Sequence, residues 1–175
     1  MAPIRARSAE EALEQLRARV AAFDGARSLM RVRATANGRT QSFRAQLVIP
    51  DRNSMELIAY TPVGTTAATI RATGDQISFV NHLENSAWEG TPEDLARSLS
   101  IYASSILPAE MAMVMIGLPA AGSATYATTP SGLLSAAVDE VVVTFHPPQF
   151  PARGVTIRRG SDVVTIEHLE IVSGQ

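Results

Sequence analysis

Alternating apolar and polar residues constrain this chain more than any other feature of its sequence. From Met30 to Ala36 every second residue is apolar, and arginine or threonine stands between them. Such a period of two predicts a strand with one buried face. Asn37-Gly38 follows, the preferred pair for a two-residue hairpin turn. The alternation resumes from Phe43 to Ile49, so this stretch predicts an antiparallel hairpin.

The same period of two recurs along most of the remaining chain. It continues through residues 55–80, so residues 28–80 predict a meander of about five strands. The last third returns to this pattern, with a glycine turn at 160–162. Further strands are expected at 126–128, 133–138, 141–145, 155–158 and 163–171. The chain therefore predicts about nine to eleven antiparallel strands that share one apolar face.

Capping signals predict the first two helices. Ser8 and Glu11 form a capping box, which indicates a helix over about 9–23. Thr91, followed by proline, indicates the start of a second helix that has Leu99 on its apolar side.

A third helix is predicted over 108–116, with Gly117 as its end. Its sequence is apolar almost all round, which is typical of a helix buried on more than one side. Its methionines Met111, Met113 and Met115 allow two interpretations. They are ordinary core residues, or their flexible side chains form a surface that adapts to varied apolar ligands.

The architecture follows from the need to cover one apolar sheet face. Helices must cover that face, because it cannot be left in water. We therefore expect a single α+β domain over 1–175, with residues 1–7 and 173–175 frayed. Its fold is a strongly curved antiparallel sheet, a half-barrel of about nine to eleven strands wrapped over about three helices. The interior is either filled by side chains or keeps a cavity.

Composition removes several classes of function. The formal net charge is −2, so the chain has no footprint for nucleic acid. All 15 basic residues are arginines, which excludes a lysine nucleophile or a phosphate-loop lysine. There are 0 cysteines, which excludes thiol catalysis, disulfides and thiolate metal sites.

The remaining residues show no local catalytic or metal-binding motif. His82, His146 and His168 are too widely spaced for a metal pattern, and we expect each to be a strand-surface or capping residue. The acidic pairs stand at helix starts or turns, where they complement the helix dipole or break strands. We therefore predict no catalytic residue, no metal and no cofactor. A hydrolase built from distant residues remains the least favoured alternative.

One segment between two predicted strands also has two interpretations. Residues 60–66 read Tyr-Thr-Pro-Val-Gly-Thr-Thr. The segment is either an ordinary Pro-x-Gly turn, or a protruding loop whose apolar tip, Val63, touches lipid.

This segment, together with 107–111 (Leu-Pro-Ala-Glu-Met) and 115–119 (Met-Ile-Gly-Leu-Pro), resembles the LolA/LolB-like superfamily. The match is nearest to the outer-membrane lipoproteins of the LolB type, and the order of elements agrees over most of the chain. The resemblance implies an apolar cavity that takes acyl chains. It also implies attachment to the periplasmic face of the outer membrane through a lipidated cysteine upstream of this sequence.

Residues can be named for two sites, the first from the resemblance and the second from the inward positions of the alternating pattern. The expected membrane-contacting loop is Pro62, Val63 and Gly64, where the family carries an exposed leucine in place of the smaller Val63. Inward-facing residues that would line the lipid cavity are Val32, Leu47, Ile49, Leu57, Ile70, Phe79, Leu99, Met111 and Met115.

These inferences predict a lipid- or lipoprotein-binding module of the bacterial envelope. It would accept or deliver acylated cargo without covalent chemistry, as a chaperone in lipoprotein localisation and protein transport. Its partners would be acyl chains of lipids or lipoproteins, a periplasmic carrier protein and the inner leaflet of the outer membrane. The alternative is a ligand-sensing or assembly partner in the envelope without transfer activity.

Overall fold

Eleven strands and two helices make up the described part of the chain. The computed structural model describes residues 2–91, 94, 108–120 and 124–174. The helices are α1 (Ala9–Ala21) and α3 (Pro108–Met115). The strands are β1 (Ala26–Ala36), β2 (Arg39–Asp51), β3 (Ser54–Tyr60), β4 (Thr66–Thr73), β5 (Gln76–Asn81), β6 (Ser86–Gly90), β7 (Thr125–Thr129), β8 (Gly132–Val138), β9 (Val141–His146), β10 (Gly154–Arg159) and β11 (Asp162–Ser173).

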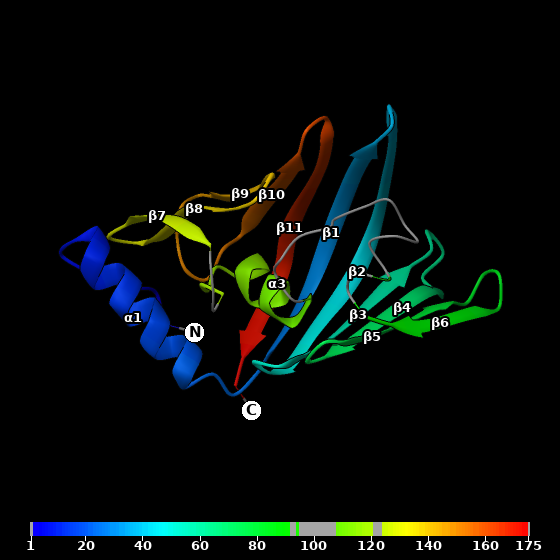
Figure 1. The fold of residues 1–175 in the computed structure, drawn as a ribbon, viewed down its shortest axis with the longest axis horizontal. Helices are drawn as coiled ribbons and strands as arrows, with labels where there is room; N and C mark the ends of the chain where they lie inside the picture. Colours follow the sequence, from blue (N-terminus) through cyan, green and yellow to red (C-terminus); the bar gives the residue numbers. More distant parts are fainter. Residues whose placement is uncertain (1, 92–93, 95–107, 121–123, 175) are drawn as a thin grey trace.

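All strands belong to one antiparallel sheet in the order β6-β5-β4-β3-β2-β1-β11-β10-β9-β8-β7. The sheet is strongly curved and does not close, and both helices lie on its concave side (Figure 1). The expected α+β fold and the expected number of strands are confirmed. Among the described residues, no helix is long and apolar enough to cross a membrane.

The β1–β2 hairpin sets the register of the centre of the sheet. Asn37 and Gly38 both have positive φ, 50° and 73°. This is the type I′ turn, whose twist matches that of the flanking strands. Ala36 therefore opposes Arg39, and the pairing continues without a break to Ala26 opposite Ile49.

The period of two separates the two faces of the sheet. In β1, Met30 and Val32 are buried while Arg31 and Arg33 are exposed. We call the face that carries Met30 and Val32 the inner face, because the helices lie on it, and the opposite face the outer face. The core is built from the inner faces of the central and C-terminal strands together with residues of both helices.

Helix α1 covers β7 and β8 at one end of the sheet. Its start is as predicted, since the Glu11 amide donates to Ser8 Oγ at 3.1 Å. It ends at Ala21, two residues before the predicted end. The reason is that the Phe23 amide donates to the Val20 carbonyl, a tighter turn that does not continue the helix.

Helix α3 packs against β2, β3 and β4 in the middle of the inner face (Figure 1). The predicted end at Gly117 is confirmed as a Schellman turn. Gly117 has φ of 92° and donates to the Val114 carbonyl, while the Leu118 amide donates to the Met113 carbonyl at 3.0 Å. The Ile116 carbonyl accepts from the Ala152 amide at 3.1 Å, which ties the end of the helix to the β9–β10 connection.

The second predicted helix falls mostly outside the described residues. Its cap is present, because the Asp94 amide donates to Thr91 Oγ1 and the Thr91 amide donates to Asp94 Oδ2. The rest of that predicted helix, with Leu99, is not described. Of the three predicted helices, two are therefore described.

The chain ends that we expected to fray are packed against the sheet. Ile4 is buried, with 4% of its surface exposed, and the Ala6 amide donates to the Pro130 carbonyl at 3.2 Å. At the other end Ser173 pairs with Ala26 as the last rung of β11. Burial of apolar side chains before α1, and ladder hydrogen bonds after residue 172, hold these two segments against the sheet.

One close backbone contact joins β8 to the chain between β9 and β10. A Cβ added to Gly132 would lie 2.8 Å from the Gln149 carbonyl carbon and 2.9 Å from the Phe150 amide nitrogen. The ring of Phe150 is buried beside this contact, and the Arg19 guanidinium of α1 lies 4.8 Å from the ring centroid. Gly132 thus allows α1, β8 and this connection to meet.

Gly132→Ala is expected to lower the free energy of unfolding by about 3 kcal/mol, because its Cβ meets backbone that cannot rotate away. Urea denaturation measures the change. Gly160→Ala is the matched control, since Gly160 also has positive φ, 58°, but none of the described residues lies within 4 Å of an added Cβ. The control should lose only about 1 kcal/mol, and equal losses would contradict the role of the close contact.

Candidate functional site

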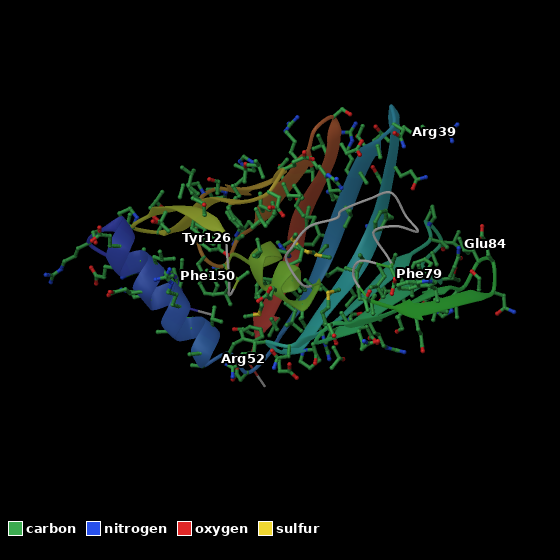
Figure 2. The ribbon with its side chains drawn as sticks, in the orientation of Figure 1. Arg39, Arg52, Phe79, Glu84, Tyr126 and Phe150 are labelled. Atoms are coloured by element: carbon green, nitrogen blue, oxygen red, sulfur yellow. The ribbon has the colours of Figure 1, made fainter. Side chains whose placement is uncertain are left out.

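The inner face of the sheet has a sealed part and a less covered part. Around α1 and the strands from β8 to β1 most inward side chains are buried, and Phe145 and Phe150 belong to this buried group. From β3 to β6 most inward side chains are only half-buried, including Leu57, Ile70 and Phe79. Figure 2 shows the two parts: Phe150 lies between α1 and α3, and Phe79 lies on the far side of α3.

Inward residues of five neighbouring strands form one continuous line across the less covered part. Leu47 opposes Leu57, Leu57 opposes Ile70, Ile70 opposes Phe79, and Phe79 opposes Trp88. We call these five residues the apolar row. Directly opposite residues in antiparallel strands have Cβ atoms about 5 Å apart, so neighbours in the row touch.

Small side chains form the next line along the same strands. Ala45 opposes Ala59, and Ala59 opposes Ala68. On the other side of the apolar row, Met55 opposes Ala72, which opposes Ile77. On β5 and β6 the alanine line continues as Asn81 and Ser86. On that side the apolar row is therefore flanked by small apolar residues on β2 to β4 and by polar residues beside Phe79 and Trp88.

The residues predicted to line a cavity separate into three groups. Leu57, Ile70 and Phe79 are half-buried members of the apolar row, and Leu47 is its buried end. Val32 on β1 and Ile49 on β2 are buried in the hydrophobic core. Leu99 lies outside the described residues.

The two methionines of the predicted set lie on α3. Met111 and Met115 are one helical turn apart and therefore on one side of the helix, and both are half-buried. Met113 and Ile116 on the other side are buried. Helix α3 packs against β2, β3 and β4, which are three of the strands that carry the apolar row.

Sequence reasoning missed Trp88, the outermost member of the apolar row. A Cβ added to Gly90 would lie 2.7 Å from the Trp88 ring, so the ring lies over this glycine. The signal was available: Trp88 and Gly90 are two residues apart on one face of a strand, and glycine there leaves room for the ring.

The predicted membrane loop is a tight hairpin connection with an apolar tip. The Thr61 amide donates to the Thr65 carbonyl at 2.8 Å, and the Gly64 amide donates to the Thr61 carbonyl at 2.9 Å. Gly64 has φ of 88°, the conformation that such a loop needs from glycine. Val63 is 86% exposed at the tip. The loop therefore holds one valine side chain out in solvent on a well-bonded base.

Two clefts lie away from the predicted cavity lining. One, of about 560 Å³, lies beside this loop and is lined in part by Pro62 and Gly64; we call it the outer cleft. The other, of about 310 Å³, lies between the end of α1, the turns after β2 and β4, and α3. Of the predicted cavity-lining residues that the structure describes, none lines either cleft.

His168 is buried, which corrects the expectation that it would be a surface or capping residue. It is 7% exposed, Ser28 Oγ lies 2.7 Å from its Nδ1, and its Nε2 donates to the Met115 carbonyl at 2.8 Å. The signal was in the alternation itself, since His168 stands two residues from the inward-facing Ile166. Buried polar groups need such partners, and His168 thereby holds the end of α3 on the sheet.

The Ser28–His168 pair does not have the surroundings of a nucleophile and its base. The imidazole is oriented by a backbone carbonyl in place of a carboxylate, and Ser28 is 2% exposed. His82, which contacts Thr69 Oγ1 at 3.0 Å, and His146 are exposed and lie elsewhere in the sheet. Within the described ranges, no three His, Cys, Asp or Glu side chains are grouped for a metal ion.

Comparisons with known proteins agree with this architecture. No protein-family model and no curated protein matches the chain. A LolA superfamily protein from Nitrosomonas europaea is 8% identical, with a TM-score of 0.58 over 97% of this chain and 95% of that one. A domain named for outer membrane lipoprotein sorting, from Vibrio parahaemolyticus, is 7% identical, with a TM-score of 0.61 over 95% and 94%.

A DUF1329 family protein from Desulfovibrio piger is also similar, at 8% identity and a TM-score of 0.57 over 94% of this chain and 92% of that one. At such identities the likeness establishes the fold. The chain has the LolA-like fold, and the resemblance to the LolA/LolB-like superfamily is supported at that level.

The burial of His168 predicts how stability depends on pH. Burial lowers the pKa of His168 from its ordinary value of 6.5, and the hydrogen bond to the Met115 carbonyl only partly opposes this. His168 therefore takes up a proton near pH 6.5 in the unfolded chain, but only at a lower pH in the folded protein. The contribution of His168 to the free energy of unfolding should be complete above pH 6.5. It should decrease as the pH falls from 6.5 through the lowered pKa of the folded state.

Urea denaturation across this pH range measures the loss, and NMR titration of the imidazoles identifies the group. The matched control is His82→Gln, which removes an exposed histidine and should keep the same pH dependence. His168→Met should reduce it. Titration of His168 at or above 6.5 would contradict the assignment.

Proposed function

We propose that this protein binds the acyl chains of lipids or lipoproteins on its inner face and accepts or delivers acylated cargo in the bacterial envelope. The observation that carries the proposal is the apolar row beside α3. Three of its members, Leu57, Ile70 and Phe79, are only half-buried, so their side chains can still make contacts with a ligand. Sites for apolar ligands are lined mainly by such side chains.

The dimensions of the apolar row suit an acyl chain. Its five residues come from five adjacent strands, which lie about 4.8 Å apart, so the row is roughly 19 Å long. One leaflet of a bilayer holds its acyl chains in a layer about 15 Å thick. The length of such a chain therefore matches the length of the row.

The Val63 loop supports a role at a membrane, where it would contact the inner leaflet of the outer membrane. Complete burial of a valine side chain contributes at most about 2 kcal/mol. That is enough for a transient contact and too little for stable attachment, which takes stronger signals. The loop therefore fits a protein that is held near the membrane by other means, such as the lipidated cysteine that LolB-type lipoproteins carry. Such a protein would receive its cargo from a periplasmic carrier.

The first test concerns the inner face. Leu57→Asn should weaken binding of a fluorescent fatty acid about tenfold, because the apolar row loses a central side chain. Ile58→Asn is the matched control, since Ile58 is the next residue of β3, is also half-buried and points to the outer face. Fluorescence titration measures both variants. Equal effects, or no fatty-acid binding by the unmodified protein, would overturn the proposal.

The second test concerns the loop. Val63→Glu should weaken binding to phospholipid vesicles in a flotation assay, since a carboxylate at the tip opposes insertion. Val172→Glu is the matched control, because Val172 is 53% exposed and lies near the C-terminal end of the central strand β11, opposite Arg27. Unchanged vesicle binding by Val63→Glu would remove the loop from the mechanism. Fatty-acid binding without any transfer to vesicles would favour the sensing or assembly role.

A further inference from the structure

The outer cleft combines a basic lining with direct contact to the loop. Arg31 and Arg44 line it from β1 and β2, and Tyr60 lines it from β3. Pro62 and Gly64, on either side of the Val63 tip, complete the wall next to the loop. None of the described residues that line it is acidic. The outer cleft is therefore a positively charged surface that adjoins an exposed apolar tip.

The two arginines are direct cross-strand partners. Arg31 opposes Arg44 in the β1–β2 ladder, and Arg44 opposes Tyr60 in the β2–β3 ladder. Like charges placed directly opposite each other in an antiparallel pair are unfavourable. The fold therefore concentrates positive charge here at a cost in stability, which an anionic ligand would offset.

Only one of these arginines has a carboxylate partner in the described part of the chain. Arg31 Nη1 lies 2.8 Å from Glu167 Oε2, in an ion pair whose side chains are more than half exposed. No described carboxylate pairs with the Arg44 guanidinium. The guanidinium has five N–H donors in a fork that matches phosphate oxygens, so Arg44 suits a phosphate group.

The position of the outer cleft favours phosphate at a membrane surface. Tyr60 is three residues from Val63, a length of chain that spans at most about 10 Å. The headgroup layer of one leaflet is roughly 5–8 Å thick. When Val63 reaches the boundary of the acyl chains, the arginines beside Tyr60 lie at the level of the headgroups.

We propose that the outer cleft binds the phosphate of a phospholipid headgroup, with Arg44 as the main cation and Arg31 as the second. This inference rests on the proposed membrane contact of the loop and adds a headgroup site to it. Headgroup binding would orient the protein with the tip of the β3–β4 hairpin toward the bilayer. It would also strengthen a contact that Val63 alone makes only weakly.

The test compares Arg44→Gln with Arg158→Gln in vesicle flotation. Arg158 is the matched control because it is also exposed on the outer face but lies on β10, away from the outer cleft. With vesicles of phosphatidylcholine and phosphatidylglycerol, Arg44→Gln should bind about fivefold more weakly, and Arg158→Gln should bind like the unmodified protein. The difference should shrink at high sodium chloride. Equal effects of the two variants would overturn the proposal, because they would indicate a general charge effect.

Three further measurements identify the source of any failure. The melting temperature of Arg44→Gln should not fall, since the change relieves a cross-strand repulsion, and its fatty-acid binding should be unchanged. If Val63→Glu weakens vesicle binding and Arg44→Gln does not, the loop contact stands and the headgroup site is wrong. If inorganic phosphate binds the free protein through Arg44 in calorimetry while vesicle binding does not depend on Arg44, the site serves a soluble phosphate and the lipid assignment is overturned.

Discussion

The continuous apolar inner face of an eleven-strand sheet must be taken out of water, and the arrangement of the rest of the molecule follows from that need. Helix α1 covers one end, and α3 covers the middle. The strands from β8 to β1 thereby gain a sealed core, while β3 to β6 keep mostly half-buried side chains. The uneven covering of one sheet separates a region that supplies stability from a region with contacts left to make.

The position of α3 depends on a few polar contacts at its C-terminal end. The Met115 carbonyl accepts from His168 and the Ile116 carbonyl accepts from the Ala152 amide, so two of the carbonyls left over by the helix are satisfied. These bonds fix the end of the helix against the sealed core. They hold α3 beside β2, β3 and β4, and the bond from His168 links that placement to the neutral form of one imidazole.

Local patterns were enough to predict the strands, the capped start of α1 and the glycine end of α3, because each depends on residues within a few positions. The two-residue turn at Asn37-Gly38 also determines the register, so counting outward from it would have paired Arg31 with Arg44. The Ser28–His168 contact joins residues 140 positions apart and depends on how β11 returns beside β1. Val32 and Ile49 were expected to face inward and are buried, but alternation identifies a face without showing how much of it the helices cover.

The sheet ends at β6 on one side and at β7 on the other, and these two strands do not pair with each other. In a closed barrel the number and stagger of the strands set the diameter. Here no ladder bond joins the two margins, so the sheet can bend more or less while each strand keeps its neighbours. The width of the space over the inner face is therefore not fixed by a closed hydrogen-bonded ladder, in contrast to the interior of a barrel.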